Sequence, residues 1–590
     1  MSTVESAENV SAVPYRDANL PIDDRVEDLL SRMTLPEKAG LMFQDMIMPG
    51  PGGTLMQETN PLLAIPPTDE LIGQKLMNHF NLLGGVKDAR EIAQWYNRIQ
   101  KRALETRLGI PITLSSDPRN HFTDNVGTSF MAGILSQWPE TLGLAALRSE
   151  ELVERFANFA RQEYLALGIR TALHPQVDLA TEPRWSRIAA TFGEDADLSS
   201  KLVAAYIRGF QGSQLGPESV ATMTKHFPGG GPQKDGEDPH FDYGKEQIYP
   251  GNNMEYHLKP FKAAIAAGTT QMMPYYGMPV GTDKEEVGFA FNKSIITDLL
   301  RKEYGFTGIV CTDWGLITDA IILGQRMPAR AWGVEHLSEV ERVQKIIQAG
   351  CDQFGGDSRP DLVIELSRLD ESVRRLLREK FTLGLFEQPF VDEEAAASIV
   401  GNAVFVKEGE DAQRRAFTLL TNKNNILPLK KSDTMAKVYV EGVDVALVEA
   451  RGFHVVESPS DADVALLRLK APYEQRPGIF ASMFHAGSLE FPAEEKAKLA
   501  TILEAVPTTI DIYLDRPAVF PELAGSAAAL LASYGSNADA FLDVVLGLAG
   551  PEGKLPFDLP SSMKAVEESR SDVPYDTANP VFRFGHGLQY

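Results

Sequence analysis

Charged side chains close several apolar segments of this sequence, and their types are suited to chemistry. Asp117, the pair Lys225 and His226, and Asp313 each follow an apolar run, as expected for residues at the ends of buried strands. A carboxylate can attack an electrophilic carbon or bind hydroxyl groups, and lysine and histidine can donate hydrogen bonds. Functional groups of a parallel barrel gather where its strands end, so we expect these side chains to form one active site.

Two local stretches give this expectation more detail. Three glycines at 229–231 follow Lys225 and His226 and would let the backbone approach a ligand closely. No Gly-Lys-Ser/Thr follows them, so this is not a phosphate loop, and the chain has no His-Glu-x-x-His zinc motif. Trp314 directly follows Asp313, an order that suits a carboxylate beside an aromatic platform for a sugar ring.

Alternating strand and helix patterns across the first two-thirds of the chain must position these groups. Helical patterns at 90–108, 149–168 and 338–349 lie between apolar segments, which favours a parallel α/β architecture. Eight segments predict a TIM-type (β/α)8 barrel: 40–48, 81–86, 111–117, 171–180, 221–227, 269–277, 308–315 and 350–356.

A second, smaller unit follows an acidic, alanine-rich connector. Apolar or alternating runs at 437–441, 464–469 and 509–514 predict strands, and 537–548 predicts a helix, so we expect an α/β sandwich domain. Stretches 553–560 and 584–590 are expected to be extended. The predicted organisation is an N-terminal arm at 1–24, the barrel at 25–385, a linker at 386–403 and the second domain at 404–590.

Composition excludes several classes of protein. The chain has 590 residues, too many for one hydrophobic core, and its 57 Lys and Arg against 81 Asp and Glu give a net charge of −24. Such an acidic surface repels nucleic acid. Two cysteines exclude a disulfide scaffold, and no apolar run would span a membrane. With no signal peptide visible, we expect a cytoplasmic protein, or a secreted or periplasmic one whose leader was removed.

Several longer motifs resemble those of glycoside hydrolase family 3. They are 32–38 (Arg-Met-Thr-Leu-Pro-Glu-Lys), 182–187 (Glu-Pro-Arg-Trp-Ser-Arg), 225–227 (Lys-His-Phe), 305–314 (Gly-Phe-Thr-Gly-Ile-Val-Cys-Thr-Asp-Trp) and 584–588 (Phe-Gly-His-Gly-Leu). The resemblance covers nearly the whole chain and corresponds to the two-domain form without a fibronectin-like domain.

The resemblance implies a role for each residue of the site. Asp313 is the implied nucleophile and Glu474, on a loop of the second domain, the implied general acid and base, with Glu490 as its alternative. Arg187 is the implied sugar-facing arginine, although Arg184 is a close rival. The implied substrate-binding residues are Asp117, Arg187, Lys225, His226, Tyr275 and Trp314.

One departure from the pattern leaves another proton donor open. The N-acetylglucosaminidase branch of the family uses an Asp–His dyad shortly after the Lys-His motif, and this chain has Asp235, Asp238 and His240 there. That branch has Gly-His-Gly, a shorter interval and a Ser or Thr where Pro239 stands, so a role in ordering the loop or lining an outer subsite is favoured for His240.

The function implied is that of a retaining, exo-acting β-glycosidase, above all a β-glucosidase, needing neither cofactor nor metal. Its partner would be a small-molecule β-glycoside or oligosaccharide, and a homodimer is left open. The alternatives are a β-xylosidase, a β-N-acetylglucosaminidase-type enzyme, a barrel aldolase or lyase with Lys225 as Schiff-base nucleophile, and a non-catalytic sugar-binding protein.

Overall fold

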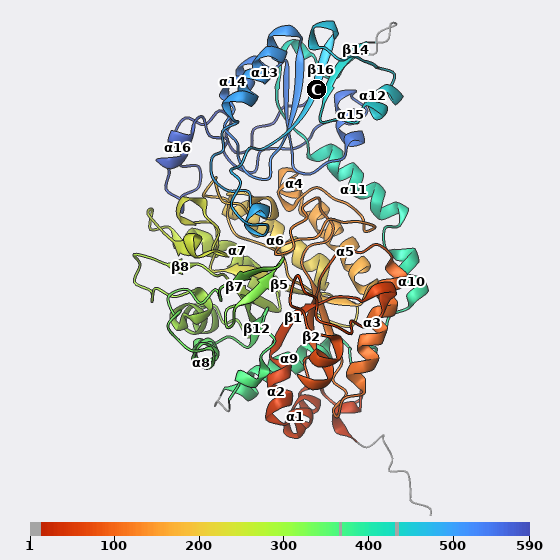
Figure 1. Ribbon diagram of the computed structural model, residues 1–590, viewed down its shortest axis with the longest axis vertical. Helices are drawn as coiled ribbons and strands as arrows, with labels where there is room; N and C mark the ends of the chain where they lie inside the picture. Colours follow the sequence, from red (N-terminus) through yellow and green to blue (C-terminus); the bar gives the residue numbers. More distant parts are fainter. Residues whose placement is uncertain (1–12, 365–367, 431–435) are drawn as a thin grey trace, which may run out of the picture.

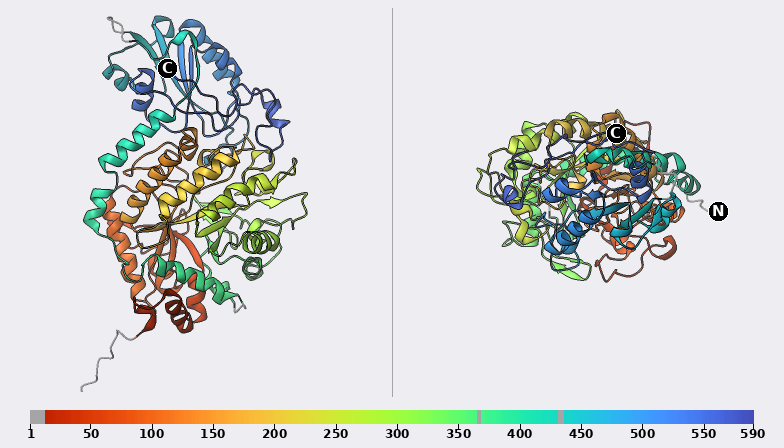
Figure 2. Two further views of the ribbon diagram at one scale, coloured as in Figure 1. Left: turned by 180° about the vertical axis from the view of Figure 1, so that it is seen from behind. Right: turned by 90° about the horizontal axis from the view of Figure 1, so that it is seen from above.

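The computed structural model describes residues 13–364, 368–430 and 436–590. Residues 1–12 of the predicted N-terminal arm therefore lie outside the described residues. The molecule is elongated, with a barrel unit and a second sheet unit stacked along its long axis (Figures 1 and 2). In the described part of the chain, no helix combines the length and apolar character needed to span a membrane.

Eight parallel strands close a barrel in the order β1-β12-β9-β7-β5-β4-β3-β2, which confirms the predicted TIM-type architecture. The second strand begins two residues before its predicted segment. The barrel strands are β1 (Phe43–Ile47), β2 (His79–Leu82), β3 (Thr113–Ser116), β4 (Ile169–Ala172), β5 (Ala221–Phe227), β7 (Gln271–Pro274), β9 (Ile309–Trp314) and β12 (Gln353–Gly355).

Helices with clear sequence signals surround the barrel. Ser149 accepts a hydrogen bond from the backbone N–H of Leu152 at the start of α5, and Ser338 forms a capping box with Glu341 at the start of α8. The α- and π-helices of this unit are α1 (Ile22–Arg32), α2 (Leu35–Leu41), the π-helix Glu70–Gln74, α3 (Ala89–Leu104), α4 (Thr141–Ala146), α5 (Glu150–Ala166), α6 (Ala196–Gln211), α7 (Met254–Ala266), the π-helix Ser294–Glu303, α8 (Glu339–Ala349) and α9 (Leu369–Thr382).

The barrel interior is filled by apolar side chains below the carboxyl ends of the strands. Leu173, Met223, Met273 and Cys311 form a buried cluster, and Trp314 packs against it. Every residue of β5 is buried, because helices cover the outside of the barrel while side chains fill the inside. Any ligand must therefore enter at the strand ends.

The second unit contains a mixed six-stranded sheet in the order β13-β18-β17-β16-β14-β15, with β13 antiparallel to β18. The predicted strands at 437–441, 464–469 and 509–514 correspond to β14, β16 and β17. The strands are β13 (Thr418–Asn422), β14 (Lys437–Glu441), β15 (His454–Val455), β16 (Val464–Lys470), β17 (Thr508–Tyr513) and β18 (Ala529–Ser533).

Helices cover this sheet and connect it to the barrel. Within the predicted linker, α10 (Glu393–Ile399) packs on α3 and α5. The other helices are α11 (Ala403–Ala416), α12 (Val445–Ala450), α13 (Ala493–Ala505), α14 (Pro521–Ser526), α15 (Ala538–Val545) and α16 (Met563–Glu567). The C-terminal stretches predicted to be extended make only single bridges, Leu559 with Phe582 and Leu419 with Leu588.

Candidate active site

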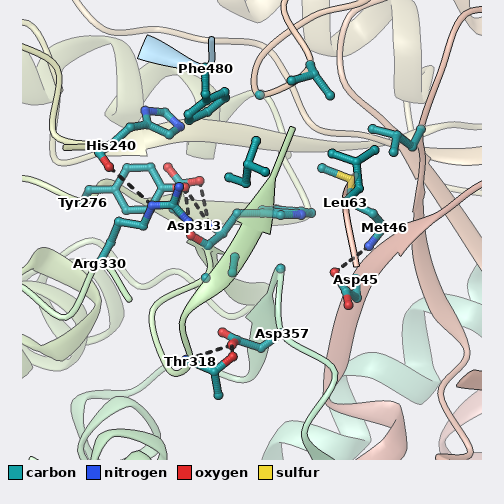
Figure 3. A pocket seen from close by; sticks show the side chains of 18 of the residues that line it. Asp45, Met46, Leu63, His240, Tyr276, Asp313, Thr318, Arg330, Asp357 and Phe480 are labelled. Atoms are coloured by element: carbon teal, nitrogen blue, oxygen red, sulfur yellow. Dashed lines mark hydrogen bonds between the residues drawn. The ribbon is translucent and has the colours of Figure 1, made fainter. Parts of the chain in front are cut away.

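A cavity of about 280 Å³ opens at the carboxyl ends of the barrel strands, and we call it the Asp313 cavity (Figure 3). Residues from distant parts of the sequence meet there, because every barrel strand points the same way. Six of the eight residues predicted for the site line it: Asp117, Arg187, Lys225, His226, Asp313 and Trp314.

Asp313 lies at the end of β9 with 6% of its surface exposed. The backbone N–H of Trp314 donates to its Oδ1 at 2.8 Å. Its Oδ2 has no hydrogen-bond partner among the described residues, and Nε2 of His226 lies 3.8 Å away. Asp313 thus has one carboxylate oxygen that is hydrogen-bonded and a second, buried one that has no partner among the described residues.

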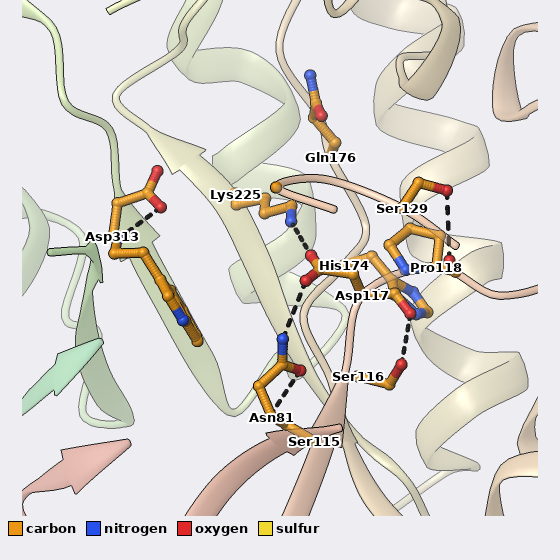
Figure 4. A network of polar contacts seen from close by, with 12 residues as sticks. Asn81, Ser115, Ser116, Asp117, Pro118, Ser129, His174, Gln176, Lys225 and Asp313 are labelled. Carbon is orange, nitrogen blue, oxygen red and sulfur yellow. Dashed lines mark hydrogen bonds and ion pairs between the residues drawn. The ribbon is translucent and has the colours of Figure 1, made fainter. Parts of the chain in front are cut away.

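Lys225 and Asp117 form a buried ion pair across the barrel from Asp313 (Figure 4). Lys225 Nζ donates to Asp117 Oδ1 at 3.0 Å, and Asn81 Nδ2 donates to Asp117 Oδ2 at 3.1 Å. Both oxygens of Asp117 are therefore oriented, and each has room for a further donor. Such a pair can bind neighbouring hydroxyl groups of one sugar ring.

His226 is held between the carboxylate of Asp178 and the guanidinium group of Arg187. Its Nδ1 lies 2.7 Å from Asp178 Oδ2, and Arg187 Nη1 lies 3.1 Å from its Nε2. Burial lowers the pKa of His226 far below its usual value, and the charge of Arg187 lowers it further. A neutral ring that donates through Nδ1 and accepts through Nε2 fits both contacts. Burial also raises the pKa of Asp178, to about 6.

Tyr275 and Tyr276 are adjacent in sequence, but their side chains have different surroundings in the structure. Tyr275, predicted as a neighbour of the nucleophile, is fully buried outside the cavity lining, and its hydroxyl donates to Asp238 Oδ2 at 3.3 Å. Tyr276 lines the Asp313 cavity, and its hydroxyl donates to the carbonyl oxygen of Trp314 at 3.0 Å. The tyrosine that supports the Asp313–Trp314 backbone is therefore Tyr276.

Asp238 and His240 also lie at this cavity, which His240 lines. His240 Nδ1 is 2.6 Å from Asp238 Oδ1, and its Nε2 makes no hydrogen bond within the described residues. Burial by itself would raise the pKa of Asp238, but the charge and hydrogen bond of His240 lower it to about 2. Burial lowers the pKa of His240, and Asp238 opposes that effect. Asp235 remains outside the lining and pairs with Arg184 at 3.6 Å.

Glu474 and Glu490 lie outside the lining of this cavity. The side chain of Glu474 is 55% exposed and accepts from Arg476 at 3.2 Å, whereas Glu490 lies 3.5 Å from Lys496. Glu474 belongs to residues 471–491, which we call the overhanging segment because they leave the second sheet and cross the barrel mouth. Arg184 is likewise outside the lining and pairs with Glu182 at 2.8 Å.

Aromatic contacts and one buried arginine hold the overhanging segment on the barrel. Phe480 lines the Asp313 cavity, and Phe484 packs on His240 with ring centroids 4.9 Å apart. Arg516 donates to the carbonyl oxygens of Pro472, Ala486 and Ser488, and also to that of Arg184 on the barrel. The second unit therefore contributes part of the wall of this site.

Sequence reasoning missed several groups of the site. Asn81 and Asp178 lie within segments predicted as strands, and Asp178 is a polar residue near a strand end, the signal that selected Asp117. Asp357, after β12, accepts from the backbone N–H and hydroxyl of Thr318 and so holds the turn that follows Trp314. Tyr276 and Arg330 also line the Asp313 cavity, but no pattern in the sequence distinguished them from other residues of their type. Among the described residues, no group of three potential metal ligands is present.

Two family models match the chain. Residues 67–374 match the glycosyl hydrolase family 3 N terminal domain, and residues 449–590 match the glycosyl hydrolase family 3 C-terminal domain. The first match contains the barrel strands from β2 to β12, and the second contains five residues before β15 and everything after them.

Similar proteins cover almost the full length of the chain. β-Glucosidase C of Emericella nidulans is 59% identical over 98% of this chain and 94% of the relative. A periplasmic β-glucosidase/β-xylosidase of Dickeya chrysanthemi is 41% identical over 98% of this chain and 91% of the relative. The solved structure of a β-glucosidase from Erythrobacter marinus shares the fold, with a TM-score of 0.78, 20% identity, and coverage of 98% of this chain and 84% of that one.

Proposed function

Because the chain belongs to glycoside hydrolase family 3, we propose that it is a retaining, exo-acting β-glucosidase that releases terminal β-D-glucosyl residues. One observation carries the proposal beyond the family. Asp313, whose Oδ2 has no hydrogen-bond partner among the described residues, lines one small cavity together with Asp117, Lys225, His226 and Arg187. The relatives named β-glucosidase support glucose as the sugar.

In this proposal Asp313 attacks the anomeric carbon. Its Oδ2 forms the ester bond to the sugar while the bond from that carbon to the leaving oxygen breaks, and water later releases the sugar with retained configuration. The backbone N–H of Trp314 keeps Oδ1 in place. The positive charge of Lys225 and Arg187 favours the ionised carboxylate that attack requires.

The proton for the leaving group has two possible sources, and the geometry favours His240 over Glu474. His240 lines the same cavity as Asp313, and Asp238 both orients its ring and stabilises its charged form. Nε2 would then donate to the departing oxygen and later take a proton from water. Glu474 is more than half exposed and would have to move into the cavity, so its role stays a sequence prediction.

Exo-action follows from the polar groups at the inner end of the cavity. Asp117, Lys225 and Arg187 line the cavity and can bind hydroxyl groups of a terminal ring, and Asn81, outside the lining, orients Asp117. Contacts that tighten as the ring flattens in the transition state accelerate the reaction more than contacts to the ground state.

A panel of aryl β-glycosides tests the proposal. We expect the β-glucoside to give the highest kcat/KM, with release of β-glucose before mutarotation, and no turnover of α-glucosides. A second candidate, β-xylosidase activity, is supported by the name of the Dickeya chrysanthemi relative. A higher kcat/KM for the β-xyloside would replace glucose with xylose, and no turnover of any β-glycoside would reject the proposal.

A further inference from the structure

A second cavity, of about 560 Å³, lies between the barrel and the second unit, and we call it the interface cavity. Barrel residues from 118 to 129 and from 186 to 190 form one wall. Strand ends of the second sheet and part of the overhanging segment form the other. Arg187 lines both cavities, so the two spaces meet at a side chain that also contacts His226.

The interface cavity lies where an open α/β sheet offers a binding crevice. From β14 the chain passes outward to β15 and then returns to β16 on the other side of β14, so the strand order reverses between β14 and β16. Gly442, just after β14, and Lys470, at the end of β16, both line the cavity. Ligands of such sheets bind outside the carboxyl ends of the strands at this reversal.

Acidic side chains and permanently basic side chains are equally numerous around the interface cavity, with three of each. Its carboxylates are Asp124, Glu140 and Asp515, and its permanent cations are Arg187, Arg468 and Lys470. A phosphate or polyanion would meet the three carboxylates, and a cation would meet the three bases. The lining therefore favours a neutral ligand that can both donate and accept hydrogen bonds.

Asp515 supplies an unused acceptor in this lining. Its Oδ2 is bonded to Nδ1 of His485, whereas its Oδ1 is buried without a partner among the described residues. Tyr473 stacks on the His485 ring, with centroids 3.7 Å apart and planes 9° from parallel. A buried carboxylate oxygen without a donor is costly, so a ligand hydroxyl that donates to this oxygen would remove that cost.

Glu140, on the barrel side of the interface cavity, can only accept hydrogen bonds when it is ionised but can also donate one when it is protonated. Its carboxylate accepts from the backbone N–H groups of Thr123 at 2.8 Å and Phe122 at 3.1 Å, and the hydroxyl of Tyr513 lies 3.4 Å away. Burial raises the pKa of Glu140 to about 7. The rings of Phe122, Phe484 and Tyr513 supply apolar faces against which the C–H groups of a sugar can pack.

We propose that the interface cavity is a second carbohydrate-binding site, which holds a neutral mono- or disaccharide while the Asp313 cavity is occupied by another ring. A sugar supplies hydroxyl donors and acceptors for this lining of mixed acidic and basic side chains. The site depends on the fold of the second unit and not on the activity proposed above.

The test measures sugar binding while the Asp313 cavity is filled. The wild-type protein is saturated with the iminosugar 1-deoxynojirimycin, and D-glucose and cellobiose are then titrated by saturation-transfer NMR. We expect residual binding of at least one sugar. Asp515→Asn and the exposed-rim variant Lys470→Ala should each weaken it at least tenfold, while Glu494→Gln, on α13 outside the cavity, should leave it unchanged.

Aryl β-glucoside turnover, measured in parallel, separates this inference from the proposed function. Normal turnover with no sugar bound to the inhibitor-saturated protein overturns the second site and leaves the β-glucosidase proposal standing. Residual binding that neither Asp515→Asn nor Lys470→Ala reduces also overturns it, because the sugar would then lie elsewhere. If turnover and iminosugar binding are absent, the proposed function fails, and the variants decide the second site by direct titration with glucose.

Discussion

Both cavities lie at the carboxyl ends of parallel strands, but the polar groups that line them differ in how far they are exposed. In the Asp313 cavity the side chains of Lys225 and Asp117 are 5% and 6% exposed. In the interface cavity the side chains of His485 and Asp515 are 32% and 15% exposed. The polar groups of the first site all lie on the barrel, whereas those of the second come from both the barrel and the second unit.

This difference indicates what each site can do. Groups that are buried, paired and fixed on strand ends cannot relax when charge develops on a substrate, and such preorganisation favours catalysis. Groups on a segment between two units can adjust to different ligands, which favours binding. The largest mutational effects on turnover should therefore come from the barrel side, and the smallest from the interface side.

The largest expected effect comes from Asp313. Asp313→Asn removes the attacking carboxylate and should lower kcat on aryl β-glucosides by at least about 10⁴-fold, with an unchanged melting temperature. Asp298→Asn, an exposed carboxylate outside the cavity that pairs with Lys302, is the matched control and should change kcat less than about threefold. Wild-type turnover in Asp313→Asn would remove the catalytic role of this cavity.

The next effect separates the two possible proton donors. His240→Gln should lower kcat/KM by about 10²–10⁴-fold on glucosides with poor leaving groups and much less on those with good ones. Azide should restore turnover in this variant. Glu474→Gln should stay within a few-fold of wild type. The opposite pattern would assign the proton to the second unit and show that the overhanging segment moves during catalysis.

A smaller effect is expected at the buried ion pair. Asp117→Asn removes a charged acceptor from the sugar ring, and a hydrogen bond to a charged group is worth about 1.5–3 kcal/mol, so kcat/KM should fall about 10- to 150-fold. The measurement compares β-glucoside kinetics of wild type, Asp117→Asn and the control Asp298→Asn. Equal kinetics in all three would place the sugar hydroxyls elsewhere in the cavity.

The last prediction concerns stability rather than turnover, on the interface side. Glu140 has a folded-state pKa of about 7, above its unfolded value, so its burial favours the folded state at low pH and opposes it as pH rises from 4.5 through 7. Glu140→Gln should remove this pH-dependent loss, which amounts to about 3 kcal/mol in the free energy of unfolding. Melting temperatures at pH 4.5 and 7.5 check it. The variant should lose less stability than wild type and Glu494→Gln, whereas parallel losses would contradict the prediction.

The barrel site could largely be predicted from sequence, because polar residues at strand ends are visible in the apolar pattern. Asp117, Lys225, His226 and Asp313 all carried that signal, and the structure brings them to one cavity. Tyr276 could not be chosen over Tyr275, because two adjacent residues at a strand end differ only in the direction of their side chains.

The second unit was harder to predict. Strands β13, β15 and β18 were missed: β15 has only two residues, and β13 pairs antiparallel at the edge of a sheet whose other members are parallel. The interface cavity depends on how two units meet, and residues such as Glu140 and Asp515, far apart in sequence, gave no local signal. The pattern that identifies a strand lies within a few consecutive residues, whereas the docking of two units depends on contacts between residues far apart in sequence.

Covalent trapping tests the central claim most directly. The wild-type protein is incubated with an activated 2-deoxy-2-fluoro-β-glucoside, which slows release of the sugar more than its attachment, and the labelled peptide is identified by mass spectrometry. We expect one fluoroglucosyl group per chain, attached to Asp313 and absent from Asp313→Asn. A label on any other side chain, or turnover without a trapped adduct, would contradict it.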